Sequence, residues 1–192
     1  ESVQNEFRSI VAFDSIQETF VEMGWHIPSI LHEDIFALDV LSVLLGQGDS
    51  SLLNRIIKRE KQMVNEIASY AYTPKDPGIF TIMASFHHEK AEPLLKEISS
   101  LVRDATNNPM SLSEIEKAKK IILSESIYEK ETVQGIAKKL GFFYTVAGSL
   151  DFEKKYYEGI QNVSAHDIMR VAKTYLHPDN ATISLLAPKE AE

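Results

Sequence analysis

The sequence predicts an α+β fold in which an antiparallel or mixed β-sheet carries helices packed on one face. Predicted helices outnumber predicted strands. The strands alternate apolar and polar residues, which is typical of half-buried strands. Along the chain the order is strands, two helices, a hairpin, several helices and a last strand, without a linker or a short repeat. We therefore expect residues 1–192 to form a single domain.

The first strands are predicted between residues 7 and 28. In residues 15–27, apolar side chains recur at every second position on one face, and these are Val21, Met23, Trp25 and Ile27. A shorter strand over residues 7–13 precedes them. Pro28 has no N–H to donate to a ladder, so the pairing is expected to stop there.

Two helices follow. Asp34 can cap a helix that runs through Leu45, and this helix is expected to be buried because it is nearly apolar all round. Residues 46–51 contain two glycines that end the helix and two serines, at 50 and 51, either of which can cap a second helix. Its expected apolar stripe is Leu52, Leu53, Ile56 and Ile57, and the residues outside the stripe are Asn54, Arg55, Lys58 and Arg59.

A β-hairpin is predicted next. The residues that share a face in its first strand are Ala68, Tyr70 and Tyr72, and those in its second strand are Phe80, Ile82, Ala84 and Phe86. Residues 73–78 connect the two strands with two prolines, an aspartate and a glycine. This composition is typical of a turn, and it indicates an antiparallel pair.

The second half of the chain is mainly helical. Apolar residues from 91 to 105 recur at the spacing of one helix face, and Asn-Asn-Pro at 107–109 ends that helix. Ser111 with Glu114 has the signature of a capping box, which begins a long helical region to about Gly148. Gly135 or Gly141 is expected to interrupt this region. The remaining elements are a short helix over residues 151–160, a helix capped by Ser164 with Asp167, and a last strand from Ala181 to Leu186 after Pro178.

Composition excludes several classes of function. The net charge of −8 argues against a nucleic-acid partner, and the dense basic segment 55–61 is interpreted as a solvated helix face. With no cysteine, the chain can form neither disulfides nor thiolate zinc sites, and it has no cysteine nucleophile. The longest apolar run, from Ile35 to Leu45, is interrupted by Asp39 and Ser42, so no membrane span is expected. We expect a soluble protein, and both a cytoplasmic and a periplasmic location remain open.

Residues 46–72 resemble a stretch of the pitrilysin/insulinase family of zinc peptidases, which includes the mitochondrial processing peptidases. The family pattern there reads G-G-x-S-S-R-L…L-R-E-K-x-L-A-x-S-V. Further segments resemble the family in the same order, and these are Gly24 to Leu41, Phe80 to Pro93, Ser113 to Lys119 and Val163 to Asp179. The order and spacing carry the resemblance, which extends over most of residues 15–190.

The resemblance implies a fold and a division of labour. Each half of such a peptidase is an α+β domain, and two halves close around a peptide like a clamshell. One half holds zinc on His-x-x-Glu-His and a more distant Glu, and the opposing half supplies an Arg and a Tyr that reach toward the substrate. The family's Arg corresponds to Arg59 in this sequence. The Tyr position corresponds to about Asn65 after a one-residue deletion, which departs from the family pattern.

Arg59 therefore has two interpretations. A guanidinium is always charged and can donate several hydrogen bonds to a substrate carbonyl or a developing oxyanion. The alternative is an exposed helix arginine in the charged cluster of residues 58–61. We retain Arg59 as the substrate-binding candidate and expect no catalytic or metal-binding residue in this segment.

No His-x-x-Glu-His occurs in the sequence. His88-Glu89 resembles the start of a His-Glu-x-x-His zinc motif, but Glu92 stands where the second His is needed, so a polar loop is the better interpretation. His26, His32, His166 and His177 are expected in surface or capping roles. Zinc is thus expected in a catalytic half that lies upstream of residue 1 or on another chain.

The leading functional hypothesis is a non-catalytic, substrate-enclosing domain of a zinc metalloendopeptidase, inactive alone. Its expected partners are the catalytic half and a peptide. The alternative is an inactive binding or regulatory partner of an active homologous peptidase, and a stand-alone binding module is a third interpretation. A homodimer is also expected to form if the closure surface leaves apolar area exposed.

Overall fold

A computed structural model describes residues 4–189. Its strands are β1 (Arg8–Asp14), β2 (Thr19–Ile27), β3 (Glu66–Tyr72), β4 (Gly78–Phe86) and β5 (Ala181–Pro188). Its α-helices are α1 (Ile35–Gly46), α2 (Ala91–Asn107), α3 (Leu112–Glu129), α4 (Val133–Phe142), α5 (Phe152–Asn162) and α6 (Ala165–Tyr175). Shorter helical segments are η1 (Asn54–Glu60), η2 (His88–Lys90), η3 (Phe143–Ala147) and η4 (Pro178–Asn180).

The five strands form one mixed sheet in the order β1-β5-β2-β4-β3. β2 pairs antiparallel with both β4 and β5, and β3 pairs antiparallel with β4, which confirms the predicted hairpin. β1 pairs with β5 in parallel, although the paired residues Arg8 and Thr182 lie at opposite ends of the chain. The predicted alternation of β2 is also confirmed, because Val21, Met23 and Trp25 are buried.

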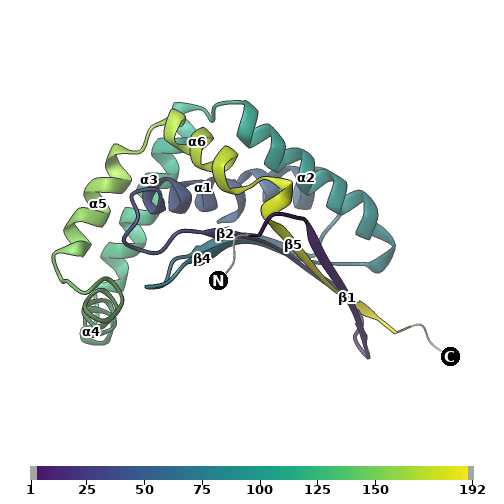
Figure 1. The fold of residues 1–192 in the computed structure, drawn as a ribbon, viewed down its shortest axis with the longest axis horizontal. Helices are drawn as coiled ribbons and strands as arrows, with labels where there is room; N and C mark the ends of the chain where they lie inside the picture. The colour runs from purple at the N-terminus through teal and green to yellow at the C-terminus, as the bar shows by residue number, and fades with distance from the viewer. Residues whose placement is uncertain (1–3, 190–192) are drawn as a thin grey trace.

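The helices form a layer on one face of the sheet, as predicted (Figure 1). α1 packs against β3, α3, α5 and α6, and nearly all of its side chains are buried. The main core lies between this layer and the sheet, and its largest fully buried side chains include Phe80, Phe86, Leu38, Leu41 and Leu94. All seven residues of β1 are exposed, so the helix layer ends before this edge strand.

The C-terminal end of α1 lies in direct contact with the backbone of β3. The Ser69 hydroxyl donates a hydrogen bond of 2.8 Å to the carbonyl oxygen of Ser42. At Gly46, an added Cβ would overlap the backbone nitrogen of Ser69 and would lie only 2.8 Å from the carbonyl carbon of Ala68. Gly46 is therefore required by this close approach rather than only as a helix stop.

The segment after α1 differs from the prediction. Residues 54–60 form a wide π-helical turn, and no side chain caps its N-terminus. Asn54, expected outside the apolar stripe, is buried, and its amide nitrogen lies within hydrogen-bond distance of Gly46 O, Ser51 Oγ and Ile67 O. The position of Asn54 outside the stripe did not reveal this burial, which is possible because its amide reaches a carbonyl at the end of α1 and another on β3.

The capping boxes at Ser111 with Glu114 and at Ser164 with Asp167 are both present. The long helical region is interrupted earlier than expected, at residues 130–132. Thr132 caps α4 by accepting a hydrogen bond from the Gly135 N–H, so Gly135 lies in the first turn of a new helix. Gly141 continues α4 without a break. In the described part of the chain, no helix is both long and apolar enough to cross a membrane.

Candidate functional site

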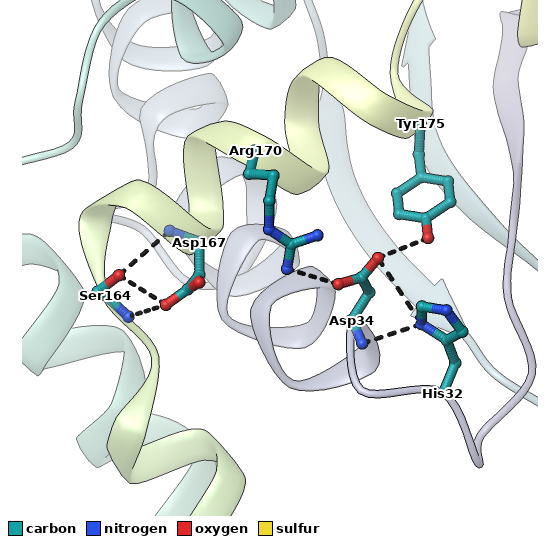
Figure 2. A network of polar contacts seen from close by, with 6 residues as sticks. All are labelled: His32, Asp34, Ser164, Asp167, Arg170 and Tyr175. Atoms are coloured by element: carbon teal, nitrogen blue, oxygen red, sulfur yellow. Dashed lines mark hydrogen bonds and ion pairs between the residues drawn. The ribbon is translucent and has the colours of Figure 1, made fainter.

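A network centred on Asp34 joins the start of α1 to α6 (Figure 2). The Arg170 guanidinium donates to Asp34 Oδ1 at 2.5 Å, and the Tyr175 hydroxyl donates to Asp34 Oδ2 at 2.6 Å. His32 Nδ1 accepts the Asp34 backbone N–H at 3.1 Å. Asp34 occupies the predicted cap position, but its side chain makes no capping hydrogen bond because these tertiary partners hold it instead. The network holds the start of α1 against α6. None of its residues lines the cavity of about 680 Å³ that is described later in this subsection.

This network predicts a loss of stability in acid. Burial alone would raise the pKa of Asp34, but the hydrogen bonds from Arg170 and Tyr175 outweigh it and hold that pKa below 3.8. A lowered pKa contributes stability above pH 4, and this contribution is lost as the pH falls further. Because Arg170 is 42% exposed, we expect Asp34→Asn to lower the free energy of unfolding at pH 7 by only about 1–2 kcal/mol.

Urea denaturation at pH 7 and pH 3 measures this effect. The matched control is Asp49→Asn, since Asp49 also pairs with an arginine, Arg59, at 2.8 Å but is 88% exposed. The control should leave stability unchanged within error. An equal loss in both variants, or a loss for Asp34→Asn that is as large at pH 3 as at pH 7, would contradict the assignment.

The sheet face opposite the helices is open. Strand register places the following residues in rows across it: Arg8–Thr182–Gly24–Thr81–Tyr70, Ile10–Ser184–Glu22–Met83–Ala68 and Ala12–Leu186–Phe20–Ser85–Glu66. A further row is His26–Ile79–Tyr72. These eighteen positions are called the open sheet face below.

Large apolar and aromatic side chains are exposed on the open sheet face. The exposed fractions are 61% for Ile10, 46% for Phe20, 49% for Tyr70, 65% for Tyr72, 38% for Ile79 and 44% for Met83. Gly24 leaves room for Ile79, because a Cβ there would lie 2.7 Å from Ile79 Cδ1. A soluble surface normally scatters such residues singly, so their grouping on one sheet face indicates a surface that contacts another molecule.

The two positions that correspond to the family's Arg and Tyr are Arg59 in η1 and Asn65 just before β3. Arg59 is in η1 with 57% of its side chain exposed, and it pairs with Asp49. Asn65 is exposed between η1 and β3, and its backbone N–H donates to Ser85 O. Tyr70 and Tyr72 lie farther along β3, on the open sheet face. The exposed ion pair between Arg59 and Asp49 contributes little free energy, so the guanidinium can leave Asp49 and contact a bound ligand instead.

The described residues do not fit a zinc ion. No three His, Cys, Asp or Glu side chains among residues 4–189 come together as a group that could hold a metal. Nδ1 of His88 lies 3.1 Å from Oγ1 of Thr19, and His32 belongs to the Asp34 network. This donor set supports no metal-dependent step within the described segment.

A separate cavity of about 680 Å³ lies between α1, β3, α3, α4, η3 and α5. Asp39 projects from α1 into it, and the Tyr156 hydroxyl donates to Asp39 Oδ2 at 2.6 Å. Burial raises the pKa of Asp39 to about 7 against the opposing effect of the Tyr156 hydrogen bond. The Asp39 side chain is half-buried and keeps partial contact with solvent because it lines an open cavity.

Sequence reasoning did not identify Asp39 and Tyr156 as a pair. One signal was present, because Asp39 is the only charged residue within Ile35 to Leu45, a helix otherwise almost wholly apolar. A carboxyl on such a buried helix needs a partner or a cavity. Its partner lies 117 positions away on α5, and no local pattern points to it.

Comparison with known proteins gives one consistent family. The model of the peptidase M16 inactive domain matches residues 3–122. The zinc protease PqqE of Helicobacter pylori is 28% identical over 183 residues, which are 94% of this chain and 40% of that protein. The chain thus spans less than half the length of this curated relative.

Two solved structures share the fold. A protease from Helicobacter pylori superposes with a TM-score of 0.90 at 26% identity, covering 96% of this chain and 45% of that chain. A peptidase M16 inactive domain from Pseudomonas fluorescens superposes with a TM-score of 0.85, covering 97% of this chain and 45% of that chain. At 16% identity, the second comparison concerns the fold alone.

Proposed function

Because the chain belongs to the peptidase M16 inactive domain family, we propose that it is the half of a zinc metalloendopeptidase that encloses the peptide substrate without catalysing its hydrolysis. Residues 1–192 act as one domain in this proposal. A catalytic half, encoded in the same gene or on a homologous subunit, supplies the zinc and the activated water. The relative named a zinc protease supports this assignment.

The open sheet face carries the proposal. It presents exposed Tyr70, Tyr72 and Met83 on three neighbouring rows, while the opposite face of the sheet is filled by the helix layer. An extended peptide or an apolar partner surface can bury these side chains from water. The open sheet face is thus the surface expected to line the chamber when the two halves close.

Arg59 is the proposed substrate contact at the margin of that chamber. Its positive charge and fork of N–H donors suit a peptide carbonyl or a developing negative charge. Asn65 lacks the phenol of the family's Tyr position, so it can offer only an amide to the substrate. Tyr70 and Tyr72 are the nearest phenols on β3, although they do not correspond to the family's Tyr.

The experiment mixes the chain with its separately purified catalytic half and follows hydrolysis of a fluorogenic peptide. We expect neither half to be active alone, and activity to rise at least about tenfold on mixing because the closed site positions the peptide. Tyr72→Ser should raise KM. The matched control is Tyr144→Ser on η3, since Tyr144 is 67% exposed and Tyr72 is 65% exposed, but Tyr144 lies outside the open sheet face.

Arg59→Ala should lower kcat/KM of the mixture by about 10- to 100-fold, the effect of a lost charged hydrogen bond. Arg55→Ala is the control, because Arg55 also lies in η1, is 49% exposed and faces a single carboxylate. Equal effects of the two variants would reject the role of Arg59.

Other outcomes discriminate between the hypotheses. Zinc-dependent hydrolysis by the chain alone would reject the non-catalytic assignment. If the chain binds an active homologue and changes its activity while its own gene lacks a zinc motif, the regulatory-partner alternative would replace the proposal. A stable homodimer that covers the open sheet face and excludes the catalytic half would also contradict it.

A further inference from the structure

We propose that the cavity between α1 and α4 is a second binding site, which takes an organic cation: a protonated amine or guanidinium on an aliphatic stem, with Asp39 as its counter-ion. This site lies on the helix side of the sheet and shares only Tyr70 with the open sheet face. Its occupation does not require the substrate-enclosing role, so the two proposals can fail independently.

The size and composition of the cavity suit such a ligand. Its volume of about 680 Å³ lies in the range of small-molecule sites. Six aromatic side chains line it: Tyr70, Tyr128, Phe142, Phe143, Tyr156 and Tyr157. Aromatic ring faces attract cations, and aliphatic stems pack well against the same rings.

Asp39 supplies the charge. Its carboxyl accepts one hydrogen bond, from Tyr156, and no Lys, Arg or His within residues 4–189 is paired with it. A carboxylate can accept about four hydrogen bonds, so acceptor sites remain for a ligand's N–H groups. The Ser42 hydroxyl does not use them, because it donates to the backbone carbonyl of Asp39 at 2.8 Å.

The nearby Lys139 is held elsewhere. Its Nζ lies 2.9 Å from Glu129 Oε2 and donates to Ser126 Oγ at 2.8 Å. It also lies 5.4 Å from the centroid of the Tyr157 ring. The protein therefore already places an ammonium group against one aromatic wall of this cavity, while Asp39 is left for another cation.

The charge balance disfavours an anion. The lining contains three carboxyls, from Asp39, Glu125 and Glu129, and two amines, from Lys138 and Lys139. Lys139 and Glu129 neutralise each other. Burial raises the pKa of the Tyr156 phenol, and the negative charges of Asp39 and the nearby Glu125 raise it further. A cation inside the cavity would thus be near two carboxylates.

Titration of the chain with defined probes tests the site. The probes are acetyl-arginine amide, which represents a peptide side chain, putrescine, which represents a free amine, and acetyl-norleucine amide, which has an aliphatic stem without charge. Binding is followed by calorimetry and by NMR shifts of the aromatic rings. At pH 8 we expect saturable binding of at least one cationic probe, at least tenfold tighter than the neutral probe, and the preferred cation identifies the source of the ligand.

Asp39→Asn should weaken cation binding at least tenfold, since the amide keeps the size and can still accept from Tyr156. The matched control is Glu158→Gln on the same helix as Tyr156, because Glu158 is 61% exposed and lies outside the cavity lining. It should change binding less than twofold. Circular dichroism checks that both variants fold.

Lowering the pH from 8 to 5.5 should weaken binding to the unsubstituted chain but not the residual binding to Asp39→Asn. The other titratable or charged groups facing Asp39 are Tyr156 and Tyr157 from α5, Glu125 and Glu129 from α3, Lys138 and Lys139 from α4, and Tyr70 from β3. They are present in both proteins, so the comparison isolates Asp39.

Equal affinity for the neutral probe, or unchanged affinity in a folded Asp39→Asn variant, would overturn the proposal. If Asp39→Asn does not fold, Glu125→Gln tests the site instead, because Glu125 is an exposed carboxylate that lines the same cavity. A twofold or greater loss of cation affinity with unchanged affinity for the neutral probe supports the site, and no loss rejects it.

Discussion

Gly46→Ala is expected to lower the free energy of unfolding by about 3 kcal/mol, because the new methyl group would enter the backbone of β3. The added Cβ would overlap the Ser69 nitrogen and would lie 2.5 Å from its Oγ. Backbone atoms cannot turn away as a flexible side chain can. α1 must therefore move off β3, which also weakens the hydrogen bond from Ser69 to Ser42 O.

Gly141→Ala is the matched control for this substitution. Gly141 also lies in a helix, α4, but an added Cβ there meets no atom within 4 Å. Alanine in an exposed helix should raise stability by about 0.5–1 kcal/mol relative to glycine. Chemical denaturation of both variants measures the change in the free energy of unfolding, which should fall for Gly46→Ala and rise for Gly141→Ala. A loss in both, or no loss for Gly46→Ala, would show that the contact between α1 and β3 is not as tight as described.

Asp39→Asn is expected to stabilise the protein at pH 8 by about 2–4 kcal/mol, because the carboxylate is costly where it lies. The pKa of Asp39 is raised from 3.8 to about 7 by burial. Well below pH 4 the folded and unfolded states both hold the proton, so Asp39 costs nothing. As the pH rises from 4 to 7, the unfolded chain releases the proton first, and the folded state loses stability until the cost becomes constant above pH 7.

The measurement is the difference in unfolding free energy between Asp39→Asn and the unsubstituted chain at several values of pH from 4 to 8. This difference should be near zero at pH 4 and should grow up to about pH 7. Glu125→Gln provides the control, since Glu125 lines the same cavity but is exposed. Its difference should stay small throughout. A difference for Asp39→Asn that is constant with pH would contradict the raised pKa.

The predictions that succeeded depended on local patterns. The period-two alternation of β2, the turn between β3 and β4, and the serine caps of α3 and α6 are all decided by residues a few positions apart. Hydrophobic periodicity and capping act over the same short range. For this reason most of the fold could be predicted from the sequence.

The contacts that the sequence did not reveal are those of polar side chains whose partners lie on other elements of the fold. Asp34 is 136 positions from Arg170, and Asp39 is 117 positions from Tyr156. Asn54 bonds to Ile67 O on a neighbouring strand. A buried polar group must find a partner, but the sequence does not show which one until the fold brings the two together. The role of Arg59 depends on the family resemblance and stays a prediction.

The pairing of β1 with β5 has a consequence for the order in which the protein is made. β5 inserts between β1 and β2, and its residues are the last of the described strands to leave the ribosome. Until then β2 has an unpaired edge and β1 has no strand to join. Contacts between residues as distant as Arg8 and Thr182 form slowly because a long loop must close first. In the nascent chain, β1 and the neighbouring edge of β2 therefore stay unpaired until β5 emerges, and the sheet is completed only by the last of these strands.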